Sequence, residues 1–126
     1  PATSGGILET KKIGDLAEEH GVAMALHMAG TPIATLASVH IASATNNFLA
    51  LEHHAADIPF WSDLVTGLPN PLVEDDGHIA VPDKPGLGFD DINEELFREH
   101  LDPADPTYFA DSSSWDREVL RDRLWS

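Results

Sequence analysis

Residues 22–34 read VAMALHMAGTPIA and place a histidine, His27, where a short apolar run stops. The run VAMAL is continuously apolar, which is typical of a strand buried on both faces in a parallel sheet. Thr31 and Pro32 then begin a second alanine-rich segment, and proline is common in the first turn of a helix. This stretch therefore predicts a strand that ends in an ionisable side chain and turns directly into a helix.

The segments on either side continue this alternation. Residues 7–20 carry apolar side chains at the spacing of an amphipathic helix, and Gly21 is placed to end it. A helix from Pro32 to about Thr45 and a second buried strand over residues 47–52 follow. Helix, strand, helix and strand joined by short connections indicate an α/β fold with parallel strands.

Each predicted strand closes on a titratable residue, His27 on the first and Glu52 on the second. The carboxyl ends of parallel strands form the functional edge of α/β sheets and barrels, so we expect both side chains at one rim. An imidazole can take or return a proton near neutral pH, and a carboxylate opposite it can hydrogen-bond a developing oxyanion or supply a proton. The alternatives are a structural histidine bonded to a backbone carbonyl and, for Glu52, a rim charge or salt-bridge partner.

The adjacent histidines His53 and His54 suggest a metal pair at first sight. Neighbouring strand residues face opposite ways, however, so we expect loop or surface histidines instead.

After these histidines, the alternation of helices and buried strands ends. An Asp-Gly turn between two short apolar stretches predicts a hairpin within residues 71–89, and residues 91–101 predict a short helix.

Composition limits the classes of function. The chain has 126 residues, 42% of them hydrophobic, which matches one domain, and no cysteine for disulfides or thiolate sites. Its net charge of −15 argues against nucleic acid or an anionic membrane as a partner, and suits a protein that stays soluble in high salt. Neither a secretory signal nor a run of membrane-span length is present in this sequence, so we expect a cytoplasmic location.

Two stretches together resemble a known family. SGGILETKKIGDLAEEHGVAMALHMAGTPIATLASVHIASATNNFLALE (residues 4–52), followed by DGHIAVPDKPGLGFDDINEE (residues 76–95), is similar to the C-terminal part of the enolase superfamily. Within it, the chain looks like the mandelate racemase and muconate-lactonizing group. The resemblance implies the last two strand–helix units of a (β/α)8 TIM-type barrel over residues 1–66. Residues 67–101 would then return to the capping domain as a hairpin and helix, and residues 102–126 would form an irregular tail.

The same resemblance implies a function. The acid-sugar dehydratases of the galactonate and gluconate type abstract the proton alpha to a carboxylate and eliminate water through an enediolate, with magnesium as cofactor. His27 falls on the position of the family's general base, or of the acid that returns the proton. Glu52 falls on the glutamate that hydrogen-bonds the substrate carboxylate. A racemase, epimerase or cycloisomerase of the same superfamily is the runner-up, and a non-catalytic fragment is the alternative from another class.

The resemblance also implies that other residues of the active site lie on strands before this sequence. The three carboxylate metal ligands belong to earlier strands, so we expect no metal ligand here. The aspartate that pairs with His27 would fall one position before Pro1. The expected partners are a small sugar-acid substrate, the N-terminal remainder of the same enzyme and further copies in a homo-oligomer. The chain by itself is expected to be inactive.

Overall fold

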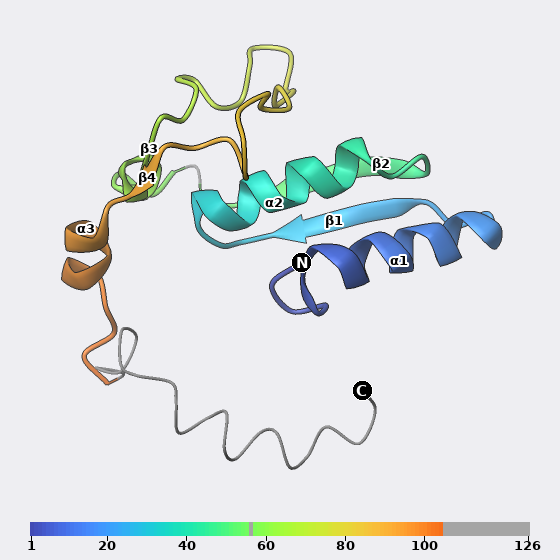
Figure 1. Cartoon of the computed structure of the whole chain (residues 1–126), viewed down its shortest axis with the longest axis horizontal. Helices are drawn as coiled ribbons and strands as arrows, with labels where there is room; N and C mark the ends of the chain where they lie inside the picture. The colour runs from blue at the N-terminus through green and yellow to red at the C-terminus, as the bar shows by residue number, and fades with distance from the viewer. Residues whose placement is uncertain (56, 105–126) are drawn as a thin grey trace. The chain divides into compact units, whose positions relative to one another are not determined.

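The computed structural model describes residues 1–55 and 57–104. Its elements, in chain order (Figure 1), are α1 (Gly6–Glu19), β1 (Met24–Met28), α2 (Pro32–Ser43), β2 (Phe48–His53), the 3-10 helix η1 (Trp61–Leu64), β3 (Val65–Thr66), β4 (Asp91–Ile92) and α3 (Glu94–Glu99). They divide into two compact units, Pro1–Glu94 and a second that begins at Glu95. Within the described ranges, no helix combines the length and the apolarity that crossing a membrane requires.

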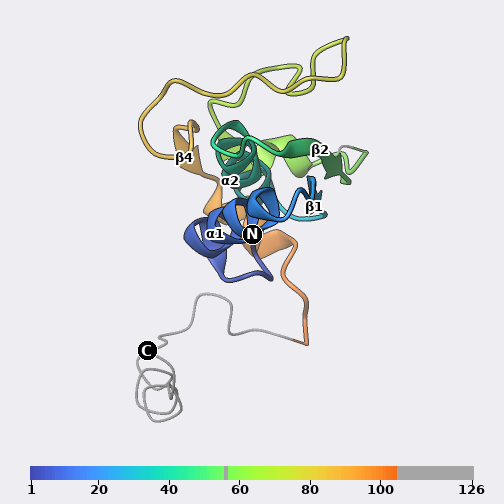
Figure 2. The same cartoon turned by 90° about the vertical axis from the view of Figure 1, so that its right-hand side faces the viewer.

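The strands β1 and β2 pair in parallel, and α2 connects them. Their register places Leu26 beside Leu51 and His27 beside Glu52. Both α1 and α2 lie on one side of this strand pair (Figure 2). The predicted α/β class with parallel strands is therefore confirmed, and the strands begin and end within two residues of the predicted positions.

The core forms where α2 packs on the strand pair. Leu26 and Met28 of β1 are buried, as are Leu36 and Ile41 of α2. The start of α2 follows from its sequence, because the Thr31 side chain accepts a hydrogen bond from the backbone N–H of the helix's first turn and proline occupies the first helical position. The local signals and the apolar packing thus agree on where the helix begins.

Burial on both faces of the strands was predicted, and this part of the prediction is wrong for the described residues. In β1 the exposed side chains of Ala25 and His27 alternate with the buried ones of Leu26 and Met28. In β2, Leu49 is 71% exposed. The helices cover one side of the strand pair, and the residues described here supply no second layer, so the side with His27 stays open to solvent.

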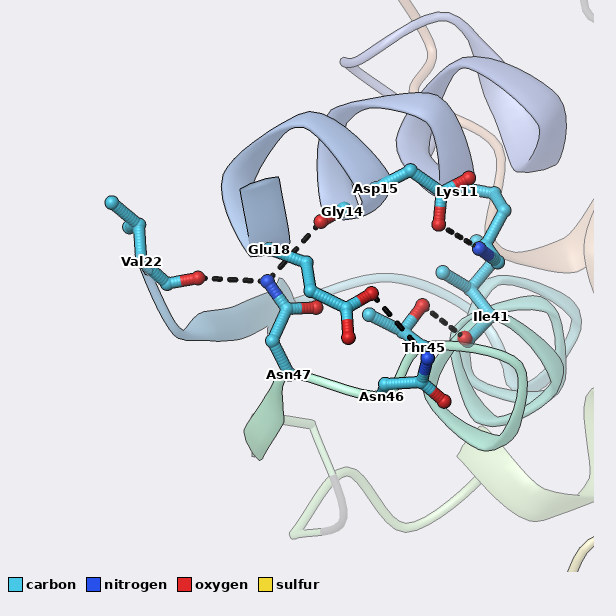
Figure 3. A network of polar contacts seen from close by, with 9 residues as sticks. All are labelled: Lys11, Gly14, Asp15, Glu18, Val22, Ile41, Thr45, Asn46 and Asn47. Atoms are coloured by element: carbon cyan, nitrogen blue, oxygen red, sulfur yellow. Dashed lines mark hydrogen bonds and ion pairs between the residues drawn. The ribbon is translucent and has the colours of Figure 1, made fainter. Parts of the chain in front are cut away.

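A polar network joins α1 to the start of β2 (Figure 3). Gly14 is buried in α1, and its carbonyl accepts a hydrogen bond of 3.1 Å from Asn47 Nδ2. The same amide donates to the carbonyl of Val22 at 2.7 Å, and the Thr45 hydroxyl donates to the carbonyl of Ile41 at 2.7 Å. Asn47 thus ties the chain just before β2 both to α1 and to Val22, which lies just before β1.

The predicted hairpin is only partly present. Its turn forms, since the Glu74 N–H donates to the His78 carbonyl at 2.8 Å, but no strand is assigned within residues 67–90. Instead β3 pairs antiparallel with β4 across this segment. Pro71 and Pro82 flank the turn without an N–H to donate, which explains why no ladder extends from it.

The helix predicted over residues 91–101 is shorter in the structure. Its first two residues pair with β3 as β4, and α3 spans Glu94–Glu99. The assignment of residues 1–66 and 67–101 to different domains stays a prediction, and most of the predicted tail, residues 105–126, lies outside the described residues.

Candidate active site

The two residues predicted at the strand ends lie in direct contact. His27 and Glu52 are register partners in β1 and β2, and His27 Nδ1 lies 2.7 Å from Glu52 Oε2. Both side chains are exposed, at 67% and 58%. Parallel pairing brings equivalent strand ends together, so the expectation of a shared rim is confirmed in its geometry.

A third residue, His54, completes the cluster. Its backbone N–H donates to the Met28 carbonyl at 3.0 Å and extends the parallel ladder by one step beyond β2. Its Nε2 lies 2.8 Å from Glu52 Oε1, and its ring centroid lies 5.7 Å from that of His27. Sequence reasoning missed this role and placed His54 on the surface. The signal was its spacing from Glu52, because residues two apart on a strand share a face.

His53 points to the opposite face, as the alternation of strand side chains predicts. Its ring meets the ring of Trp61 edge-on at a centroid distance of 5.4 Å. Partial burial lowers the pKa of His53, which keeps the imidazole neutral. The Trp61 indole N–H in turn donates to the Gly30 carbonyl at 2.8 Å. The segment after β2 is thus fixed to the turn after β1.

The electrostatics of the cluster follow from its hydrogen bonds. The bond from His27, and then the one from His54, lower the pKa of Glu52, so this carboxyl is ionised near neutral pH. An ionised carboxylate can only accept, so His27 carries a hydrogen on Nδ1, and Nε2 is the nitrogen that can offer a lone pair when the ring is neutral. In this arrangement Glu52 has no proton to supply, contrary to one of the roles considered for it. It accepts a hydrogen bond from the imidazole instead.

The three side chains also raise the question of a metal. Their ligand atoms lie within 4.8 Å of one another. Magnesium is a hard cation that takes oxygen ligands in an octahedron, and two imidazoles with one carboxylate do not match that preference. The cluster is therefore a poor magnesium site, and the location of the magnesium ligands outside this sequence stays a prediction.

A separate apolar groove lies over α2, β2 and the segment that follows. Its volume is about 430 Å³, and Phe48, Leu49, Val73 and Ile79 are among its lining residues. None of the three cluster residues lines it. The groove is therefore distinct from the candidate active site.

A parallel strand pair backed by helices, with an imidazole and a carboxylate at its carboxyl end, matches the arrangement expected of a portion of an α/β barrel. The chain belongs to the Enolase C-terminal domain-like family, whose model matches residues 1–96. The expected resemblance is confirmed, and with it the fold class as a portion of a TIM-type barrel.

Individual proteins of known name are similar to this chain over part of their length. The chain is 44% identical over 84 residues to a D-xylonate dehydratase of Haloferax volcanii, a match that covers 67% of this chain and 20% of the relative. It is 33% identical over 113 residues to a D-gluconate/D-galactonate dehydratase of Picrophilus torridus, covering 89% and 28%. Among solved structures, a mandelate racemase/muconate lactonizing enzyme-like protein of Rubrobacter xylanophilus aligns with a TM-score of 0.69 at 39% identity, over 79% of this chain and 25% of that one. The chain thus spans about a quarter of the length of these relatives.

Proposed function

We propose that the chain is the C-terminal portion of an acid-sugar dehydratase and contributes the base that removes the proton alpha to the substrate carboxylate. The observation that carries this proposal is the 2.7 Å contact between His27 Nδ1 and Glu52 Oε2 at the carboxyl ends of paired parallel strands. The similarity to dehydratases that act on sugar acids supports the choice of reaction.

His27 acts through Nε2, the nitrogen that its contact with Glu52 leaves free. This nitrogen takes the proton from the carbon next to the carboxylate, and the electrons of that C–H bond pass into an enediolate. Collapse of the enediolate expels the hydroxyl of the next carbon, which takes up a proton and departs as water. The resulting enol rearranges to a 2-keto-3-deoxy acid. Glu52 stabilises the imidazolium that forms on His27.

A role for Glu52 in hydrogen-bonding the substrate carboxylate would require a proton on Glu52. The lowered pKa of Glu52 disfavours that proton near neutral pH. We therefore assign Glu52 to the orientation of His27 and to the stabilisation of its charge. The group that protonates the departing hydroxyl is not assigned to a residue of this chain.

We also propose magnesium as the cofactor, since the family relationship favours it. When bound, the ion would make the alpha proton of the substrate more acidic, because it would neutralise charge on the substrate carboxylate. Its ligands are assigned to carboxylates outside this sequence, because the imidazole-rich cluster here does not suit the ion. The N-terminal remainder of the enzyme, which would hold them, is the main proposed partner, and a homo-oligomer is the proposed assembly.

Racemisation or epimerisation is the second candidate. In that case His27 removes the proton from one face of the alpha carbon and a second acid delivers a proton to the opposite face. A structural neighbour carries the racemase name. Dehydration is preferred because relatives that cover 67% and 89% of this chain are dehydratases. A cytoplasmic, high-salt setting is proposed from the net charge of −15 and the Haloferax volcanii relative.

The test is the variant His27→Asn in the complete enzyme that contains this chain. With magnesium and D-xylonate, D-gluconate or D-galactonate, we expect turnover to fall by about 10²–10⁴-fold, the usual contribution of a positioned base. His20→Asn is the matched control, since His20 is exposed at the end of α1 and should leave the rate unchanged. Full turnover in His27→Asn would refute the assignment of the base. The chain alone, given the same reagents, should neither bind nor convert the substrates.

A further inference from the structure

We infer that His54 is a positioning residue of this site, which holds the Glu52 carboxylate in place beside His27. The inference rests on the proposed function for its catalytic meaning, but the contact itself does not depend on the reaction. It adds a third residue to the two that the strand ends predicted.

The geometry shows how His54 reaches Glu52. The backbone N–H of His54 bonds the Met28 carbonyl at 3.0 Å, so its backbone is tied to the end of β1. Its side chain leaves on the same face as Glu52, and its Nε2 lies 2.8 Å from Oε1. His27 takes the other oxygen, Oε2, at 2.7 Å. Each carboxylate oxygen is thus bound by a different imidazole.

The second bond matters because Glu52 is exposed. Its side chain is 58% accessible, and a glutamate with one partner can still rotate about its side-chain bonds and lose that partner to water. A donor on each oxygen fixes the carboxylate plane and therefore the direction of the His27 ring. Among the described residues, the titratable groups that contact the Glu52 carboxylate are His27 from β1 and His54 after β2. These two imidazoles account for the lowered pKa of Glu52.

The first experiment uses this chain and measures the Glu52 carboxyl titration by NMR in buffer with EDTA, so that no divalent cation bridges the side chains. Hydrogen bonding from His54 lowers the pKa of Glu52, so His54→Ala should move its titration midpoint to higher pH. His54→Gln places an amide donor near the position of Nε2 and should restore much of the shift. His78→Ala is the matched control, because His78 pairs with Asp76 instead and should leave Glu52 unchanged.

The second experiment measures the pH dependence of kcat and kcat/KM in the complete enzyme. Loss of a positioning contact should lower kcat by about ten- to a hundredfold with little change in KM. At acid pH, the part of the fall in kcat/KM that follows protonation of Glu52 should begin at higher pH in His54→Ala, because Glu52 then loses one of the two donors that lower its pKa. The side chain of His54 is 55% exposed, so its removal should not unfold the domain, and His54→Gln should recover most of kcat.

The outcomes separate this inference from the proposed function. An unchanged Glu52 midpoint in His54→Ala overturns the positioning role, whatever reaction the enzyme performs. An unchanged kcat and pH profile in that variant overturns it as well. If the midpoint moves but the complete enzyme dehydrates no sugar acid, the proposed function falls and the contact between His54 and Glu52 stands.

Discussion

Replacement of Gly14 by alanine tests whether close packing or helix propensity decides the stability of the α1–α2 junction. A Cβ atom at Gly14 would lie 3.0 Å from Cγ2 of Thr45 and 3.8 Å from Cγ of Met24. The second distance is an ordinary contact, but the first requires Thr45 to move. Thr45 is 7% exposed and its hydroxyl bonds the Ile41 carbonyl at 2.7 Å, so its side chain has little freedom to do so (Figure 3).

Two opposing contributions decide whether Gly14→Ala raises or lowers the free energy of unfolding. Alanine is better than glycine by about 1 kcal/mol inside a helix, which favours the variant. Overpacking of a well-filled junction costs about 1–3 kcal/mol, which opposes it. A shift of α1 would also stretch the bond from Asn47 to the Gly14 carbonyl. We therefore expect Gly14→Ala to lower the free energy of unfolding by about 1 kcal/mol.

The assay is urea unfolding followed by circular dichroism, in a double-mutant cycle with Thr45→Ser. Serine removes Cγ2, the obstructing atom, and keeps the hydroxyl that bonds Ile41. In the Thr45→Ser background the same Gly14→Ala change should become stabilising by about 0.5–1 kcal/mol. The cycle cancels whatever Thr45→Ser costs by itself. A stabilising effect of Gly14→Ala in the native background, or equal effects in both backgrounds, would refute the steric reasoning.

Two further predictions concern the segment behind the site and the charge of the chain. Trp61→Phe keeps an aromatic ring beside His53 but leaves the Gly30 carbonyl without its indole donor, so we expect about 1–3 kcal/mol less stability by urea unfolding; no loss would mean that this bond does not fix the segment. The net charge of −15 predicts that KCl raises the thermal midpoint, mainly between about 0.1 and 1 M, where the screening length falls from about 10 to 3 Å. A midpoint that is flat over this range would contradict the role of repulsion.

The first half of the fold was predictable because several local signals agreed there. The apolar run before His27, the Thr31–Pro32 start and the small residues of the next segment all indicated strand, turn and helix. The later segment lacked such agreement. The Asp-Gly turn was recognised, but its neighbours form no ladder, and the antiparallel pair joins residues about 25 positions apart. Strands of two residues each carry no periodic pattern, so their pairing depends on packing that the local sequence does not encode.

The site divides in a similar way. His27 and Glu52 could be predicted because parallel strands bring their carboxyl ends together, and the structure places them as register partners. His54 could not be ranked above other histidines, since its role depends on a side-chain direction and on the ladder bond to Met28. The apolar face of α1 was read from the same kind of pattern, yet Leu8 and Leu16 are 65% and 57% exposed. A periodic pattern indicates which side of a helix is suited to burial. It does not show which residues cover that side, and the described residues do not cover Leu8 and Leu16.

The solvent exposure of the site helps to explain why three of its side chains lie in contact. Exposed ion pairs contribute only about 0–1 kcal/mol to folding, because water screens the charges and the side chains lose freedom. His27, Glu52 and His54 are all more than half exposed, and the core lies on the other side of the strands, around Leu26 and Leu36. Stability therefore does not account for two imidazoles bound to one carboxylate at this rim. The proposed proton transfer would account for them, since it requires a base with one nitrogen held and the other free.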